Sequence, residues 1–201
     1  MPIFTSQPDD TSGLDTYITS ENATTNYGTN ATMRVGNQID AYNNRGLLKF
    51  DLSTIPSSAI VSSAILTLTI STAWGAANVA IYRQKKAWVE AQATWNIYST
   101  GNNWTSAGGF NASDCEQTNI GSGTPSSNSV GTVLNITLSA SAIQEMIAGS
   151  FTNNGFLIKT TTEAGDNATL FATSSHATSS YRPKLVIGYS LPSGGHAYWF
   201  D

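Results

Sequence analysis

The sequence predicts an all-β fold: an antiparallel two-sheet β-sandwich, jelly-roll-like, with one short helix. The first observation is composition, because the 201 residues include 26 Thr, 25 Ser, 17 Asn and 17 Gly but only 11% charged residues. Ser, Thr and Asn compete with helical hydrogen bonds, whereas Thr suits strands and Asn and Gly suit turns. The second observation is that apolar and polar residues alternate in many short runs. The third is that turn-forming residues separate these runs.

The strand at 64–71 has the clearest alternation, since Leu66, Leu68 and Ile70 point to one side while Thr67 and Thr69 point to the other. Similar patterns recur along the chain. Taken in order, the nine predicted strands are 15–19, 32–35, 46–52, 64–71, 78–83, 133–138, 155–159, 168–172 and 184–189.

One helix is predicted near residue 141. Ser141 followed by Gln144 resembles a capping box, and Gly149 ends the pattern. The apolar stripe between them is formed by Ile143, Met146 and Ile147. We expect this helix to cover an open end of the sandwich. The longest irregular stretch, 98–130, is rich in Gly, Asn and Ser and is long enough to suggest a functional loop.

Composition also excludes several classes of protein. A net charge of −4, with nine scattered Lys and Arg, leaves no basic patch for nucleic acid. No apolar run approaches the ~18 residues that a membrane span needs. The first residues have neither the basic segment nor the apolar segment of a secretory signal peptide. Cys115 has no second cysteine to pair with, and two histidines make no zinc cluster.

Several motifs occur in a distinctive order. They are Arg45-Gly-Leu-Leu-Lys-Phe-Asp-Leu-Ser-Thr-Ile-Pro56 with its continuation to Leu68, Asp15-Thr-Tyr-Ile18, Asn26-Tyr-Gly-Thr29, Trp88-Val-Glu-Ala-Gln-Ala-Thr-Trp-Asn96, Trp104 with Gly108-Gly109, Gly155–Lys159, and Tyr181-Arg-Pro-Lys-Leu-Val-Ile-Gly-Tyr189. Together they resemble the DNRLRE family over residues 15–189. This is a β-sandwich module related to disaggregatase repeats and to carbohydrate-binding modules.

The resemblance implies one β-sandwich domain over 1–190, followed by an aromatic tail at 191–201. Modules of this kind are mainly non-catalytic parts of secreted polysaccharide-degrading or cell-surface proteins, and some bind acidic polysaccharides such as alginate. One position departs from the family pattern. Where a glutamate is expected before the last strand, the chain has His176 after Ser174 and Ser175.

Two cationic residues, Arg45 and Lys49, are candidates for binding uronate carboxylates. Lys49 alternates with apolar neighbours and should face away from the core. Charge-assisted hydrogen bonds from such residues grip carboxylates well. The alternative, which we favour for motif residues of a sandwich, is that they form structural ion pairs with Asp51 or Glu90.

Three aromatic residues, Trp74, Tyr98 and Trp104, are candidates for stacking on sugar rings. Trp74 lies in a turn between predicted strands, and the other two lie in the long polar loop. Exposed aromatic rings bury the apolar faces of sugars. The same rings can instead hold a long loop against the sheet. We expect Trp88 and Trp95, which lie within the 88–96 motif, to be largely in the core.

No enzyme site is predicted. Glycoside hydrolysis needs two carboxylates across a cleft, and no feature selects such a pair among 13 acidic residues. The neighbours of Cys115 are acidic and should raise its thiol pKa. No cofactor is expected. A structural calcium on Asp9, Asp10, Asp15 or Asp166 has weak support, because their spacing matches no dedicated calcium loop.

The tail carries His196, Tyr198, Trp199 and Phe200 after a Ser-Gly-Gly link. Such aromatic residues either fold back over an edge strand or dock on a partner subunit, and we favour the partner. The expected function is a non-catalytic structural or adhesive surface protein of a larger assembly, a phage virion component with glycan binding. We expect it on the virion surface or outside cells. The alternative is a carbohydrate-binding module of a secreted polysaccharide-degrading enzyme.

Overall fold

The computed structural model describes residues 1–38 and 42–192. The elements in chain order are β1 (Ile3–Ser6), β2 (Leu14–Thr19), β3 (Thr32–Asn37), β4 (Asn43–Lys49), β5 (Ile60–Thr72), β6 (Val79–Arg83), β7 (Ile97–Ser99), β8 (Asn102–Asn103), β9 (Gly121–Gly123), β10 (Val133–Thr137), α1 (Ala140–Ala148), β11 (Phe156–Thr160), β12 (Thr169–Ala172), the 3₁₀ turn η1 (Ser179–Tyr181) and β13 (Lys184–Ser190).

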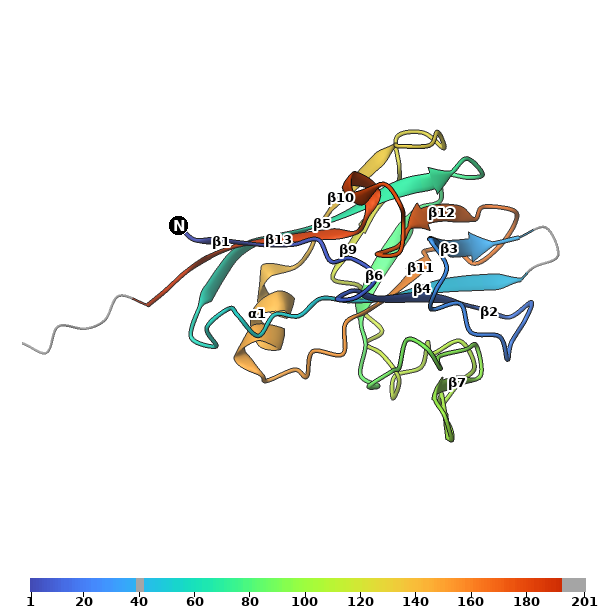
Figure 1. Ribbon diagram of the computed structural model, residues 1–201. Coiled ribbons are helices and arrows are strands. Elements are labelled where there is room, and N and C mark those ends of the chain that lie inside the picture. The colour runs from blue at the N-terminus through green and yellow to red at the C-terminus, as the bar shows by residue number, and fades with distance from the viewer. Residues whose placement is uncertain (39–41, 193–201) are drawn as a thin grey trace, which may run out of the picture.

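Eleven strands form one curled antiparallel sheet, in the order β1-β13-β5-β12-β3-β4-β11-β6-β9, with β10 paired to β5 and β2 paired to β4. Its two halves face each other as layers of a sandwich, joined through β12 and β3 (Figure 1). β7 and β8 form a separate small hairpin. The predicted all-β sandwich is confirmed. Within the described residues, no helix combines the length and hydrophobicity that crossing a membrane requires.

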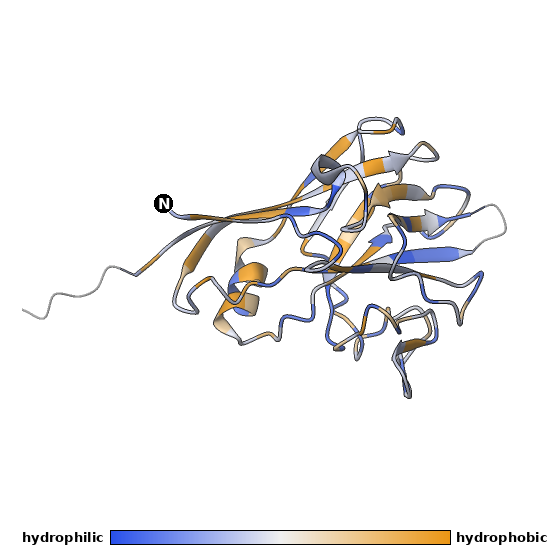
Figure 2. Cartoon of the chain, viewed as in Figure 1, coloured by the Kyte–Doolittle hydropathy of each residue, from blue (hydrophilic) through white to orange (hydrophobic). Residues whose placement is uncertain are grey.

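The main core lies between the layers. Leu66, Leu68 and Ile70 of β5 are fully buried, as the alternation predicted, and they share one cluster with Leu48 and Ile158 from the opposite layer. Hydrophobic residues accordingly concentrate on the strands that face the interior (Figure 2). The free-energy gain from burying such side chains is about 1.5–3 kcal/mol each, and it holds the layers together.

A second core covers the other face of β4, β11 and β6. Leu47 and Leu157 alternate with main-core residues along their strands and point to this side, where they meet Trp88, Trp104 and Cys115. These three come from the long stretch after β6. Both faces of this sheet are therefore buried, which explains its continuous apolar runs.

The predicted helix is present, but its start differs by two residues. Ser139, not Ser141, is the N-cap, because its hydroxyl accepts a hydrogen bond from the Ala142 N–H at 3.3 Å. Gln144 does not complete a capping box, since its Oε1 accepts from the Val61 N–H at 2.8 Å. This bond ties the helix to β5. Gly149 ends the helix with a left-handed backbone (φ 79°), as expected.

Candidate functional site

Arg45, a candidate for binding uronate carboxylates, is buried in the structure, with 7% of its surface exposed. Its Nε and Nη2 donate to the two carboxylate oxygens of Glu163 at 2.7 and 2.9 Å, and Nη1 donates to the Gly108 carbonyl at 2.8 Å. The guanidinium also lies 4.9 Å from the Trp95 ring centre. Because it is buried and paired, Arg45 is unavailable to a uronate. Arg45 thus forms a structural ion pair, but its partner is Glu163 rather than Asp51 or Glu90, and no ion pair among the described residues includes Lys49.

Trp104 is likewise not the exposed loop aromatic residue that the sequence suggested. It is 4% exposed, and its indole N–H donates to the Thr94 carbonyl at 2.9 Å. Tyr98 is half-buried and lies 5.4 Å from Trp104, centre to centre. A large aromatic ring gains free energy when it is buried, even when it belongs to a polar loop. Trp104 and Tyr98 therefore hold the 98–130 stretch against the sheet.

Trp74 is exposed as predicted, with 44% of its surface accessible. It precedes β6, and three contacts fix it. Its indole N–H donates to Asp166 Oδ1 at 3.3 Å, its carbonyl accepts from Asn128 Nδ2 at 3.2 Å, and the Arg34 guanidinium lies 5.8 Å from its ring centre. The contacts with Asp166 and Arg34 orient the exposed ring, and a ring that is oriented before binding loses less entropy when it binds a ligand.

Arg34 of β3 connects Trp74 to a pair of tyrosines. Its guanidinium is also 5.8 Å from the Tyr17 ring centre, and Tyr17 stacks on Tyr27 with centres 4.3 Å apart. Burial raises the pKa of Tyr17 to about 12, so the phenol stays a neutral donor. We name Tyr17, Tyr27, Arg34 and Trp74 the aromatic–arginine site.

A hollow of about 150 Å³ opens beside this site. The residues that line it are Tyr17, Asn30, Thr32, Arg34, Thr72 and Leu170. Arg34 Nη1 donates to Gln38 Oε1 at 2.9 Å and lies 3.5 Å from Glu21. Sequence reasoning found Trp74 but missed Arg34, because β2, β3 and the turn before β6 meet only in the folded chain.

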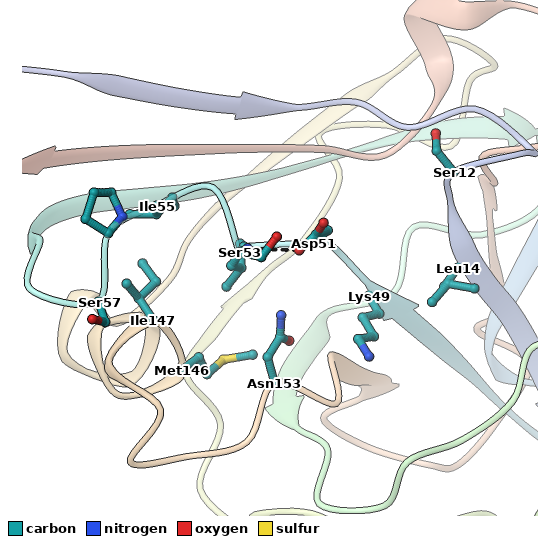
Figure 3. A pocket seen from close by; sticks show the side chains of 12 residues that line it. Ser12, Leu14, Lys49, Asp51, Ser53, Ile55, Ser57, Met146, Ile147 and Asn153 are labelled. Atoms are coloured by element: carbon teal, nitrogen blue, oxygen red, sulfur yellow. Dashed lines mark hydrogen bonds between the residues drawn. The ribbon is translucent and has the colours of Figure 1, made fainter.

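Lys49 lies elsewhere, in a larger cleft of about 650 Å³ (Figure 3). We name it the Lys49 cleft; its lining residues are Ser12, Leu14, Lys49, Asp51, Leu52, Ser53, Ile55, Pro56, Ser57, Met146, Ile147 and Asn153. Asp51 accepts a hydrogen bond from the Ser53 N–H at 2.8 Å, and this bond lowers the pKa of its carboxyl group. The candidate residues therefore do not converge on one site.

The remaining titratable candidates serve the fold. Asp15 is 1% exposed and accepts from the Ser174 N–H at 2.7 Å, while burial raises the pKa of its carboxyl group to about 6. Burial also raises the pKa of Cys115 to about 11. His176, at the expected glutamate position, is half-buried and stacks on Tyr181. Within residues 1–38 and 42–192, no three His, Cys, Asp or Glu side chains lie together as metal ligands would.

Comparison with known protein families matches residues 15–187 to the disaggregatase-related repeat domain. The chain belongs to this family. The DNRLRE-type resemblance of the sequence motifs is thereby confirmed, and membership of the disaggregatase-related repeat family points to a carbohydrate-binding or surface domain. No curated protein matches the chain. The predicted partner-binding residues His196, Tyr198, Trp199 and Phe200 lie outside the described residues.

Proposed function

We propose that this disaggregatase-related repeat domain is a non-catalytic surface module that binds saccharides at the aromatic–arginine site. The observation that carries the proposal is the exposed Trp74 ring, held beside Arg34 and a hollow lined by hydrogen-bonding side chains. A sugar ring offers apolar C–H faces to an indole and hydroxyl groups to polar side chains, so both kinds of contact are needed together.

The polar groups beside Trp74 suit this role. Asn30, Thr32 and Thr72 supply amide and hydroxyl groups to the hollow, while the fork of Arg34 donors recognises paired oxygens. A uronate carboxylate is one such pair, and two adjacent sugar hydroxyls are another. Glu21 already lies 3.5 Å from Arg34, so an acidic sugar would have to displace or share this partner.

The surroundings of the acidic residues support a non-catalytic role. Asp15 and Glu90 both have a carboxyl pKa raised by burial, as a general acid requires. However, Asp15 is bonded to Ser174, and Glu90 accepts the Asp15 N–H at 2.9 Å. They pack against each other and do not face each other across a cleft, as the two carboxylates of a glycosidase do.

Calorimetric titration with an alginate tetrasaccharide and with cellotetraose tests the proposal. Trp74→Ala should weaken binding of the preferred sugar by about 1–2 kcal/mol, roughly five- to thirtyfold. Arg34→Lys should weaken it too, because lysine keeps the charge but loses the planar fork. Val133→Ala, an exposed residue on β10, is the matched control. Equal affinities for Trp74→Ala and Val133→Ala would remove the site from consideration.

Our second proposal is that the module acts within a larger assembly, such as the surface of a phage virion. Support comes from the outer face of β1, β13, β5 and β10. Its outward side chains include the exposed Ile3, Ile65 and Val133, and among its described residues the one charged side chain is that of Lys184. A flat face with few charges is suited to being covered by another subunit.

Light scattering on untagged protein purified from its source tests the assembly role. A stable multimer, or co-purification with a large particle, is the expected result, and Ile65→Lys should dissociate it by placing a charge in the covered face. A monomer that never accompanies a particle would favour the alternative, a binding module of a polysaccharide-degrading enzyme.

A further inference from the structure

The Lys49 cleft has an apolar floor that the saccharide site does not use. Leu52, Ile55, Met146 and Ile147 form this floor, and Leu14, 39% exposed, adds to its rim. The Asn153 amide is already engaged. Its Nδ2 donates to the Phe50 carbonyl at 2.9 Å, and its Oδ1 accepts from the Gly155 N–H. The other polar lining residues are Ser12, Lys49, Asp51, Ser53 and Ser57, so the cleft combines an apolar floor, which suits large side chains, with polar groups beside it.

The cleft has a cation at one end. Lys49 lies beside Leu14, while Ile55 and Ser57 lie at the opposite end (Figure 3). Among the described residues, no ion pair includes Lys49. The carboxylate among the residues that line the cleft is that of Asp51, which is exposed and hydrogen-bonded to Ser53. A ligand that is apolar at one end and acidic at the other would match this order.

One segment of this chain has that order of chemistry. Residues 193–201, which lie outside the described part, read Ser-Gly-Gly-His-Ala-Tyr-Trp-Phe-Asp. Three consecutive aromatic residues are followed by Asp201. The aromatic side chains bury more than 150 Å² each when covered, so an apolar floor stabilises them strongly.

The segment can reach the cleft within one molecule. Ser190 of β13 pairs with Ile60 of β5, and Ser57, three residues before Ile60, lines the cleft. Tyr198 comes eight residues after Ser190, a length that spans up to about 26 Å when extended. A short linker of this kind keeps the effective concentration of the segment in the millimolar range, which favours its own cleft over that of another molecule.

We propose that residues 196–201 occupy the Lys49 cleft of the same molecule, with Tyr198, Trp199 and Phe200 on its apolar floor and the Asp201 carboxylate beside Lys49. This assigns the segment an intramolecular site in place of the partner subunit that the sequence alone favoured. The proposal is independent of saccharide binding at the aromatic–arginine site.

Cysteine cross-linking tests the proposal. Ser57→Cys with Ala197→Cys places thiols at the cleft and on the segment, and a short bismaleimide joins them when they are close. The natural thiol interferes little, because Cys115 is buried and has a pKa of about 11. Asn135→Cys with Ala197→Cys is the control, since Asn135 is exposed on the outer sheet face.

The expected product is a cross-linked monomer that forms at least about tenfold faster at Ser57 than at Asn135. Equal rates at the two positions would overturn the proposal. Cross-linked dimers in place of monomers would also overturn it, and would make a second copy the occupant.

A charge exchange probes the acidic end of the segment. Asp201→Lys should slow cross-linking at Ser57, because two cations then meet, and Lys49→Glu should restore the rate in that background. Asp201 follows the last strand in the sequence, and Asp201→Lys alone gives a result even if Lys49→Glu impairs folding. An unchanged rate in Asp201→Lys would contradict the placement beside Lys49.

Discussion

Arg45 of β4 and Glu163, in the turn after β11, are joined by two parallel hydrogen bonds at 2.7 and 2.9 Å. Lys159 shares the same carboxylate, with its Nζ 3.5 Å from Glu163. Lys159 is 7% exposed, and this burial lowers the pKa of its ammonium group. One carboxylate therefore compensates two buried cations, and the pair belongs to the interior rather than to a ligand site.

We expect Glu163→Gln to destabilise the protein by about 3–5 kcal/mol, because it leaves the buried Arg45 and Lys159 charges without a counter-charge. Urea unfolding at pH 7 measures this loss. Glu21→Gln is the matched control, since Glu21 lies 3.5 Å from the more exposed Arg34. Its cost should be below about 1 kcal/mol. Similar losses in the two variants would contradict a special role for Glu163.

Trp104→Ala should cost about 3–5 kcal/mol of stability, because it empties a buried site in the second core and leaves the Thr94 carbonyl without its donor. Trp104→Phe should cost less, since it retains most of the packing. Trp74→Ala provides the comparison, with an expected change within about 1 kcal/mol for an exposed ring. Thermal and urea unfolding of the three variants would settle the difference. A Trp104→Ala protein as stable as Trp74→Ala would be at odds with the burial.

Asp15 should make stability depend on pH. The folded pKa of about 6 lies above the ordinary value of 3.8, so the protonated carboxyl group is the form that folding favours. Its stabilising contribution is complete below pH ~4 and is lost as the pH rises through 6, by about 2–3 kcal/mol. Glu90, whose pKa burial also raises, acts in the same direction.

Unfolding free energies measured from pH 4 to 7.5 check this expectation. Asp15→Asn should flatten the profile, because the amide cannot ionise. Asp51→Asn is the control, since hydrogen bonds from Ser53 lower the pKa of Asp51 from 3.8. Its contribution is lost only as the pH falls below the measured range, so this variant should keep the slope of the unchanged protein. An Asp15→Asn profile as steep as that of the unchanged protein would show that another group dominates.

Two glycines with left-handed backbones should respond differently to alanine. Gly155 has φ 76°, and an added Cβ would lie 2.4 Å from the Leu48 carbonyl oxygen, which β4 holds in place. Gly149 has φ 79° and open space around it. Gly149→Ala should cost about 1–2 kcal/mol for the backbone alone. Gly155→Ala should cost clearly more, and equal melting temperatures would count against the close approach.

Much of the fold could be predicted from local pattern. Each of the nine predicted strands overlaps a strand of the structure, because alternation records which face is buried. The strands that were missed, β1 and β7 to β9, have two to four residues, too few to show a period. From the sequence alone, Arg45 and Trp104 could each serve either a ligand site at the surface or the packing of the sandwich. The local sequence around these two residues gives no sign that a second layer covers the outer face of β4.

The candidate site was predicted only in part for a related reason. Trp74 could be identified because a tryptophan in a short polar turn has little to pack against. Arg34 and Tyr17 look like ordinary strand residues, and their relation to Trp74 arises from the pairing of β3 with β12 and of β2 with β4. Chemistry that depends on the meeting of distant strands leaves no signal in local spacing.

The layer that carries Trp88, Trp104 and Cys115 has a consequence for motion. It packs on a sheet whose other face is already sealed by the main core, so it could detach without exposing that core. Amide protons of residues 86–116 would then exchange with solvent through a partial opening that needs less free energy than global unfolding, while those of β5 would wait for the whole chain to unfold. The protein would thus have two levels of stability, with its longest loop region as the first to open.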